Sequence, residues 1–177
     1  MDSINQQQPE DNYEPLNGPA AAKKIQELAK QAQTCFFCTN GPRDGFATRP
    51  MNLFPVDERG HSFFLSANDS HKNAEVAADP RVRLLLQGSD HSDFLSLAGT
   101  ATISRNQTKI DELWNPLLKT WFTEGKDDPR ITVIEVTPEG GYYWDNKHGN
   151  AVATVKMAFG ALIGQTLDDS LEGELRP

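Results

Sequence analysis

The stretch FFLSANDSHKNAEVAADP, residues 63–80, decides the fold, because it changes from a strand pattern to a helix pattern across a capping turn. Its aromatic start favours a strand over 61–66, and the residues after the turn predict a short helix over 72–78. Ser70 is a residue type that caps helix starts, and the first amides of a helix attract anions. The helix dipole disfavours a lysine at position 72. Ser70 and Lys72 therefore indicate an anion site, and an ordinary capped helix with a solvated lysine is the alternative.

A second stretch, Thr48-Arg49-Pro50-Met51, lies inside a strand predicted over 46–56. Strand alternation places Arg49 and Met51 on the same face. Pro50 removes one donor from the ladder, so we expect this strand at a sheet edge or a bulge. A cation beside a proline-interrupted ladder leaves backbone groups free to meet a planar ligand. The alternative is a surface arginine on an edge strand.

The rest of the chain alternates between strand and helix patterns. Strands are predicted over 34–39, 46–56, 61–66, 82–86, 94–103 and 131–136 with a continuation at 142–144, and helices over 20–33, 72–78, 110–121 and 150–163. Sequential strands with short turns predict a mainly β (α+β) fold, in which an antiparallel sheet of about six to seven strands closes into a barrel with flanking helices. We expect one domain over 19–165 between flexible tails at 1–18 and 166–177.

Composition narrows the function classes. The 177 residues carry a net charge of −8, which argues against non-specific nucleic-acid binding but allows a local basic pocket. The chain starts without a secretory signal pattern and has no apolar run long enough to span a bilayer, so we expect a cytoplasmic protein with no membrane partner. Cys35 and Cys38 form an isolated C-x-x-C on a predicted strand. Because no second pair of ligands accompanies them, we expect two core cysteines and no metal site.

Several short motifs follow one another in a recognisable order: Asp44-Gly45, Arg49-Pro50-Met51, Phe64-Leu65-Ser66, Ser70-x-Lys72, Asp79-Pro80-Arg81-Val82, Gly99-Thr100-Ala101, 110–114, 121–129 and Tyr143-Trp144-Asp145. In these motifs, residues 20 to about 163 resemble the general-stress-protein branch of the pyridoxamine-5′-phosphate-oxidase-like FMN-binding split barrels. No single motif is specific, and the resemblance rests on their number and order.

The resemblance implies FMN as the cofactor. The residues that it assigns by position are Arg49, Pro50 and Met51 along the flavin, Leu65 and Ser66 at the ring or ribityl chain, and Ser70 and Lys72 at the phosphate. Trp144 is similar to the tryptophan that approaches the ring from the second subunit of a homodimer, and burial in the core is the alternative. Trp114, Trp121 and the helix over 152–163 are candidates for the dimer surface, which would carry the flavin at the subunit interface.

Three positions depart from the pyridoxamine oxidases of this family. Residues 145–149 (DNKHG) stand where those enzymes carry an Arg-x-His substrate motif, which argues against vitamin B6 oxidation. Phe94 replaces a glutamine near the flavin, and His71 replaces an arginine in the phosphate turn.

Together these observations predict an FMN-dependent oxidoreductase. It would take electrons from NAD(P)H or another small-molecule donor and pass them to an unidentified acceptor, with no assigned acid-base residue. The second hypothesis is a protein that stores or senses FMN without turnover, and the third is a pocket for a deazaflavin.

Overall fold

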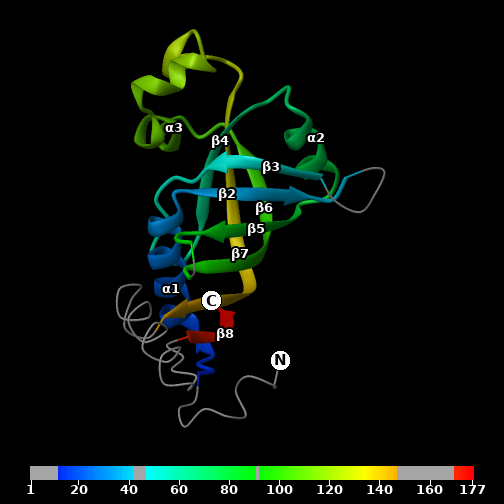
Figure 1. The fold of residues 1–177 in the computed structure, drawn as a ribbon. Helices are drawn as coiled ribbons and strands as arrows, with labels where there is room; N and C mark the ends of the chain where they lie inside the picture. Colours follow the sequence, from blue (N-terminus) through cyan, green and yellow to red (C-terminus); the bar gives the residue numbers. More distant parts are fainter. Residues whose placement is uncertain (1–11, 42–46, 91, 147–169) are drawn as a thin grey trace.

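The computed structural model describes residues 12–41, 47–90, 92–146 and 170–177 (Figure 1). The strands are β1 (Leu16–Asn17), β2 (Thr34–Thr39), β3 (Ala47–Asn52), β4 (Ser62–Ala67), β5 (Arg81–Gln87), β6 (Phe94–Ser104), β7 (Ile131–Asn146) and β8 (Ser170–Arg176). The helices are α1 (Gly18–Ala32), α2 (His71–Ala78) and α3 (Gln107–Leu113), and the 3-10 helices are η2 (Pro116–Thr120) and η3 (Gly125–Asp127). The mainly β fold class is confirmed.

Local sequence explains most of these boundaries. α1 starts with a proline in its first turn and ends where Gln33 adopts a left-handed conformation with φ of 58°. The helix predicted over 110–121 is interrupted, and η2 begins at Pro116, because a proline has no N–H to continue the ladder. The two strand segments predicted at 131–136 and 142–144 are one continuous strand, β7. The helix predicted over 150–163 lies outside the described residues.

β7 is the strand around which the sheet is arranged. It pairs antiparallel with β6 along one edge, while its other edge pairs first with β4 and then with β8. The strand order is β1-β8-β7-β6-β5-β2-β3, with β4 beside β7. A bulge in β7 lies opposite Gly99, where a side chain would collide with the Thr137 carbonyl.

The sheet is open between β3 and β4. In the described part of the chain, β3 pairs only with β2, and β4 only with β7. The expected hydrogen-bonded closure is therefore incomplete, and the barrel is split at this point. Pro50 lies on β3, an edge strand, as predicted, because a missing N–H is tolerated there. In Figure 1, β2, β3 and β5 cross β4 and β7 steeply, as expected for a strongly twisted sheet.

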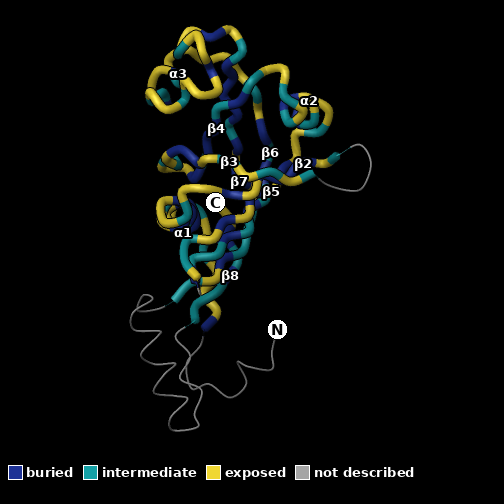
Figure 2. The backbone as a smooth tube through the Cα atoms, turned by 45° about the horizontal axis from the view of Figure 1, so that its top comes forward, coloured by how far each residue is buried: buried dark blue, intermediate teal, exposed yellow. Residues whose placement is uncertain are grey.

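Two clusters of apolar side chains hold the layers together. In the larger one, the fully buried rings of Phe37 on β2 and Phe64 on β4 pack edge to face, with centroids 5.1 Å apart. The smaller one joins α3 to β4 and β7 through residues that include Phe63 and Ile110. Figure 2 shows burial concentrated in the central strands, whereas the outer surface of the α3 region is exposed. The smaller cluster fixes α3 and η2 beside the end of β4.

The expectation of flexible tails is wrong for residues 12–17 and 170–176. β1 pairs parallel with β8, β8 pairs antiparallel with β7, and Leu175 is buried. Gly173 allows this contact, since a side chain there would collide with the backbone of Glu14. Both segments have a polar composition and gave no strand pattern. The strands pair nevertheless, because the hydrogen bonds of the ladder join backbone groups.

The two cysteines lie inside the protein. Cys35 and Cys38 are both buried and free, and burial raises the pKa of Cys35 to about 12. Both cysteines therefore pack in the core, as expected.

None of the described helices is long and apolar enough to cross a membrane.

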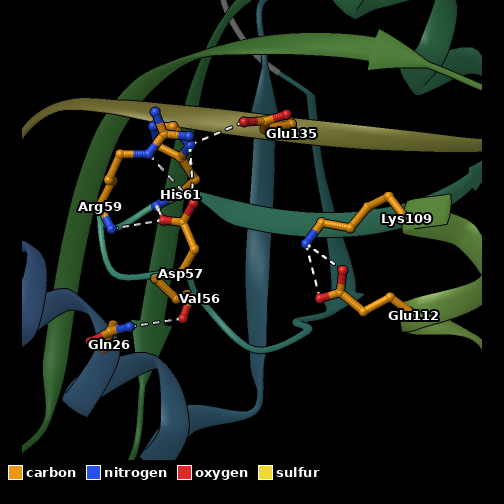
Figure 3. A network of polar contacts seen from close by, with 8 residues as sticks. All are labelled: Gln26, Val56, Asp57, Arg59, His61, Lys109, Glu112 and Glu135. Atoms are coloured by element: carbon orange, nitrogen blue, oxygen red, sulfur yellow. Dashed lines mark hydrogen bonds and ion pairs between the residues drawn. The ribbon is translucent and has the colours of Figure 1, made fainter. Parts of the chain in front are cut away.

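A polar network fixes the connection between β3 and β4 (Figure 3). His61 Nδ1 lies 3.3 Å from Asp57 Oδ2 and 3.0 Å from Glu135 Oε1 on β7. Gln26 Nε2 on α1 donates to the Val56 carbonyl at 3.0 Å. The Gln26 hydrogen bond ties the connection to α1, and His61 places it beside Glu135 on β7.

Candidate functional site

A groove of about 360 Å³ lies at the split between β3 and β4. Its walls come from β3 and the chain after it, the end of β4, the start of α2, and η2 with the two residues that follow. The lining residues are Pro50, Met51, Asn52, Phe54, Leu65, Ser66, Ala67, Lys72, Leu118, Trp121 and Phe122. Most of the residues expected at the flavin therefore meet here, from segments that are separate in the sequence.

Lys72 is the charged residue of this lining. No hydrogen bond or ion pair joins its half-buried ammonium to any residue that the structure describes. Burial lowers the pKa of Lys72 below its ordinary value, the positive charge of Arg49 lowers it further, and Glu75 acts in the opposite direction. A cation that has lost hydration without gaining a partner is stabilised by an anion. The geometry therefore supports an anion site at Lys72.

A buried hydrogen-bond network holds the turn between β4 and α2. The Ser66 hydroxyl donates to Asn73 Oδ1 at 2.6 Å, and Asn73 Nδ2 donates to the Thr132 hydroxyl at 2.9 Å. The Thr132 hydroxyl in turn donates to the Ser66 carbonyl at 2.8 Å. Ser70 is the predicted cap: it accepts the Asn73 N–H at 3.3 Å, and its hydroxyl lies 3.2 Å from that of Ser66. The network sets where α2 starts, and with it the position of Lys72.

Arg49 is not part of the groove lining. Its guanidinium lies 2.6 Å from Glu75 Oε2 on α2 and donates to the Thr39 hydroxyl at 2.7 Å. The ion pair ties β3 to α2, and the positive charge of Arg49 lowers the pKa of Lys72. Direct contact between Arg49 and a flavin stays a prediction.

The Arg49–Glu75 pair gives the stability a dependence on pH. Burial acts to raise the pKa of Glu75, but hydrogen bonds from Thr39 and Arg49 outweigh it, so this pKa lies below its ordinary value. A lowered carboxyl pKa stabilises the fold above the unfolded value, about 4.3, and this contribution is lost as the pH falls through the folded value.

We expect Glu75→Gln to lower the unfolding free energy by about 0.5–1 kcal/mol at pH 7. Its deficit relative to the wild type should shrink when urea unfolding is repeated at about pH 3. Glu58→Gln, which changes an exposed carboxylate, is the control. A Glu75→Gln deficit of the same size at both pH values would contradict the assignment.

Trp144 is not part of the groove. It lies on the half of β7 that pairs with β8, opposite Phe94 on β6, and its ring packs on Tyr142 with centroids 4.7 Å apart. The side chain is 38% exposed, so core burial within the chain is wrong. Contact with a flavin from a second subunit stays a prediction.

Sequence reasoning missed part of the site. Asn73 carried a usable signal, because a polar residue three positions after the Ser70 cap can return a hydrogen bond to the turn. Leu118 and Phe122 carried none, since their helical spacing is equally typical of a core helix. Trp121 was singled out, but as a candidate for the dimer surface.

These features define a class of protein. A mainly β chain whose sheet is split, with a largely apolar groove at the split and a cation in its described lining, has the architecture of a split barrel. Residues 20–168 match the family described as pyridoxamine 5'-phosphate oxidase like, and the chain belongs to that family. The resemblance inferred from the sequence is confirmed.

Individual relatives support the same placement. General stress protein 26 of Bacillus subtilis (strain 168) is 35% identical over 78 residues, which cover 42% of this chain and 54% of that protein. The chain thus matches about half the length of this relative. The crystal structure of General Stress Protein 26 from Bacillus anthracis str. Sterne superposes with a TM-score of 0.60 at 25% identity, covering 69% of this chain and 92% of that one. The structure of the general stress FMN/FAD binding protein from Xanthomonas citri superposes with a TM-score of 0.59 at 24% identity. The match covers 68% of this chain and 84% of that one.

Proposed function

We propose that this chain is a cytoplasmic, stress-related flavoprotein that binds FMN in the groove between β3 and β4. The observation that carries the proposal is Lys72, a half-buried cation without a described partner in a largely apolar groove. The FMN phosphate supplies the missing anion, and the isoalloxazine ring matches the apolar walls. The Xanthomonas citri relative, described as FMN/FAD binding, supports a flavin as the ligand.

The residues present fit this group. Lys72 binds the phosphate beside the capped start of α2, where unpaired amides add positive potential. Met51 and Leu65 face the groove from opposite sides of the split and exclude water from the ring. Asn52, on the edge strand, offers an amide for polar atoms of the ring. When bound, FMN supplies the capacity to accept and release electrons, and the chain positions it.

We propose that the protein is an oxidoreductase. Its bound flavin would be reduced by NAD(P)H or another donor and reoxidised by a small-molecule acceptor. A store or sensor of FMN is the second candidate, and one observation favours it. The described lining of the groove contains no histidine, aspartate, glutamate, cysteine or tyrosine that could exchange a proton with a substrate. Hydride transfer does not require such a group, so the two functions have to be separated by experiment.

The purified protein distinguishes them. We expect a yellow preparation whose flavin, released by denaturation, is identified as FMN rather than FAD or a deazaflavin by chromatography. Bleaching by NADH or NADPH, followed by reoxidation with air or an added acceptor, identifies an oxidoreductase. A yellow protein that resists both reductants is a binding protein. A colourless protein that takes up no added FMN would overturn the proposal.

We further propose that the protein is a homodimer. The outer face of the sheet exposes Phe36 and Leu85, which are register partners on β2 and β5, with relative exposures of 55% and 38%. An apolar face of this kind is typical of an interface, and two-fold dimers are the commonest assembly. Light scattering during gel filtration should give twice the chain mass, and a single chain mass at micromolar concentration would contradict the dimer.

A further inference from the structure

One wall of the groove is made by a short helix that the proposed phosphate site does not explain. In a 3-10 helix, side chains three residues apart lie above one another. Leu118 on η2 and Trp121 directly after it have this spacing, and both line the groove. Leu117, which has a different orientation on the same helix, does not line the groove and is 79% exposed.

This wall is held in place without a ligand. Asn115 caps η2 by accepting the Leu117 N–H at 3.0 Å, and Phe122, next to Trp121, is buried in the cluster under α3. Arg130 donates to the Trp121 carbonyl at 3.4 Å and is itself bound to Asp128. The backbone that carries the indole is therefore anchored on both sides.

The indole itself is not anchored. Trp121 is 66% exposed although it lines a groove and neighbours a buried aromatic residue. Such a ring, on a fixed backbone and facing an apolar groove, is suited to packing against a planar ligand. Trp144, the tryptophan expected at the ring from the sequence, lies outside this lining.

We propose that Trp121 contacts the isoalloxazine ring of a flavin bound to the same chain. This inference rests on the proposed function and deepens it: Lys72 recognises the phosphate, while Trp121 and Leu118 recognise the ring. The two contacts make different demands on the ligand, because riboflavin has the ring but no phosphate.

The test uses flavin-free full-length protein titrated with FMN and, separately, with riboflavin. We expect Trp121→Ala to raise the Kd for both ligands by about five- to tenfold, the lower part of the range for a lost aromatic stacking contact. Emission of the bound flavin should also rise, because an indole in contact with the ring quenches it. Trp121→Phe, which keeps a smaller ring and guards against a folding artefact, should retain most of the affinity.

Matched variants separate this contact from its neighbours. Leu117→Ala removes an apolar side chain of η2 that is even more exposed than Trp121, and it should change neither Kd nor emission. If Trp121→Ala leaves both Kd and emission at the wild-type values, or weakens FMN but not riboflavin, the ring contact is refuted while the proposed function stands. If Trp144→Phe raises the flavin emission and Trp121→Ala does not, the ring contact of Trp121 is also refuted. Wild-type protein that binds neither ligand would overturn the proposed function, and this inference with it.

Discussion

Lys72→Ala should weaken FMN binding by about 1.5–3 kcal/mol, which is a rise in Kd of roughly ten- to a hundredfold. The reason is that the ammonium has no described partner and stands beside the start of α2, so the phosphate is the interaction that it lacks. Isothermal titration of the flavin-free protein with FMN measures the change. Lys119→Ala, which removes an exposed lysine of the nearby η2, is the matched control.

The same residue predicts an opposite effect on the free protein. Because burial lowers the pKa of Lys72, the charged ammonium is less favourable in the folded chain than in the unfolded one. Lys72→Met should therefore raise the melting temperature of the flavin-free protein while it weakens FMN binding. FMN affinity should fall as the pH rises and Lys72 loses its proton. Because the pKa of Lys72 is lowered, this fall should occur at a less alkaline pH than for an ordinary lysine.

Two outcomes would contradict the role of Lys72. The first is an FMN affinity that Lys72→Ala leaves within a factor of two of the wild type. The second is an equal loss for riboflavin, which has no phosphate and should bind the variant as it binds the wild type. A loss confined to FMN, with a higher melting temperature of the free protein, is the pattern that an anion site requires.

The sequence predicted the site best where one residue type has a local physical preference. Ser70 before a helix and Pro50 in a strand have few structural settings, and the structure places both as expected, at a helix cap and on an edge strand. Lys72 stood out because it conflicts with the helix dipole. Local conflict of this kind is a useful sign of function, since a fold does not require it.

Sequence reasoning failed where structure depends on a partner far along the chain. β8 reads as a polar tail, and only its pairing with β7 and β1 makes it a strand. Arg49 pairs with Glu75 on α2, a contact that the sequence did not predict. The wall at Trp121 depends on the cluster under α3, which brings η2 to the split. No local preference encodes any of these contacts.

Asn73→Ala should lower the unfolding free energy by about 2–3 kcal/mol, because it removes the centre of a buried polar network. The amide both accepts from Ser66 and donates to Thr132, so the alanine leaves buried hydroxyl groups with fewer partners. Urea unfolding at pH 7 measures the loss. Asn68→Ala, in the same turn but exposed, should cost less than about 0.5 kcal/mol.

The loss should extend to the ligand, because the network sets the start of α2 and hence the place of Lys72. Asn73→Asp separates the two effects: it keeps the oxygen that accepts from Ser66, loses the donor to Thr132, and adds a negative charge near the anion site. We expect Asn73→Asp to unfold at urea concentrations between those of the wild type and Asn73→Ala, yet to bind FMN more weakly than either. Asn73→Asp protein that binds FMN as tightly as the wild type would show that the phosphate does not lie at this turn. If Asn73→Ala is as stable as the wild type, the hydrogen-bond network does not hold the turn between β4 and α2.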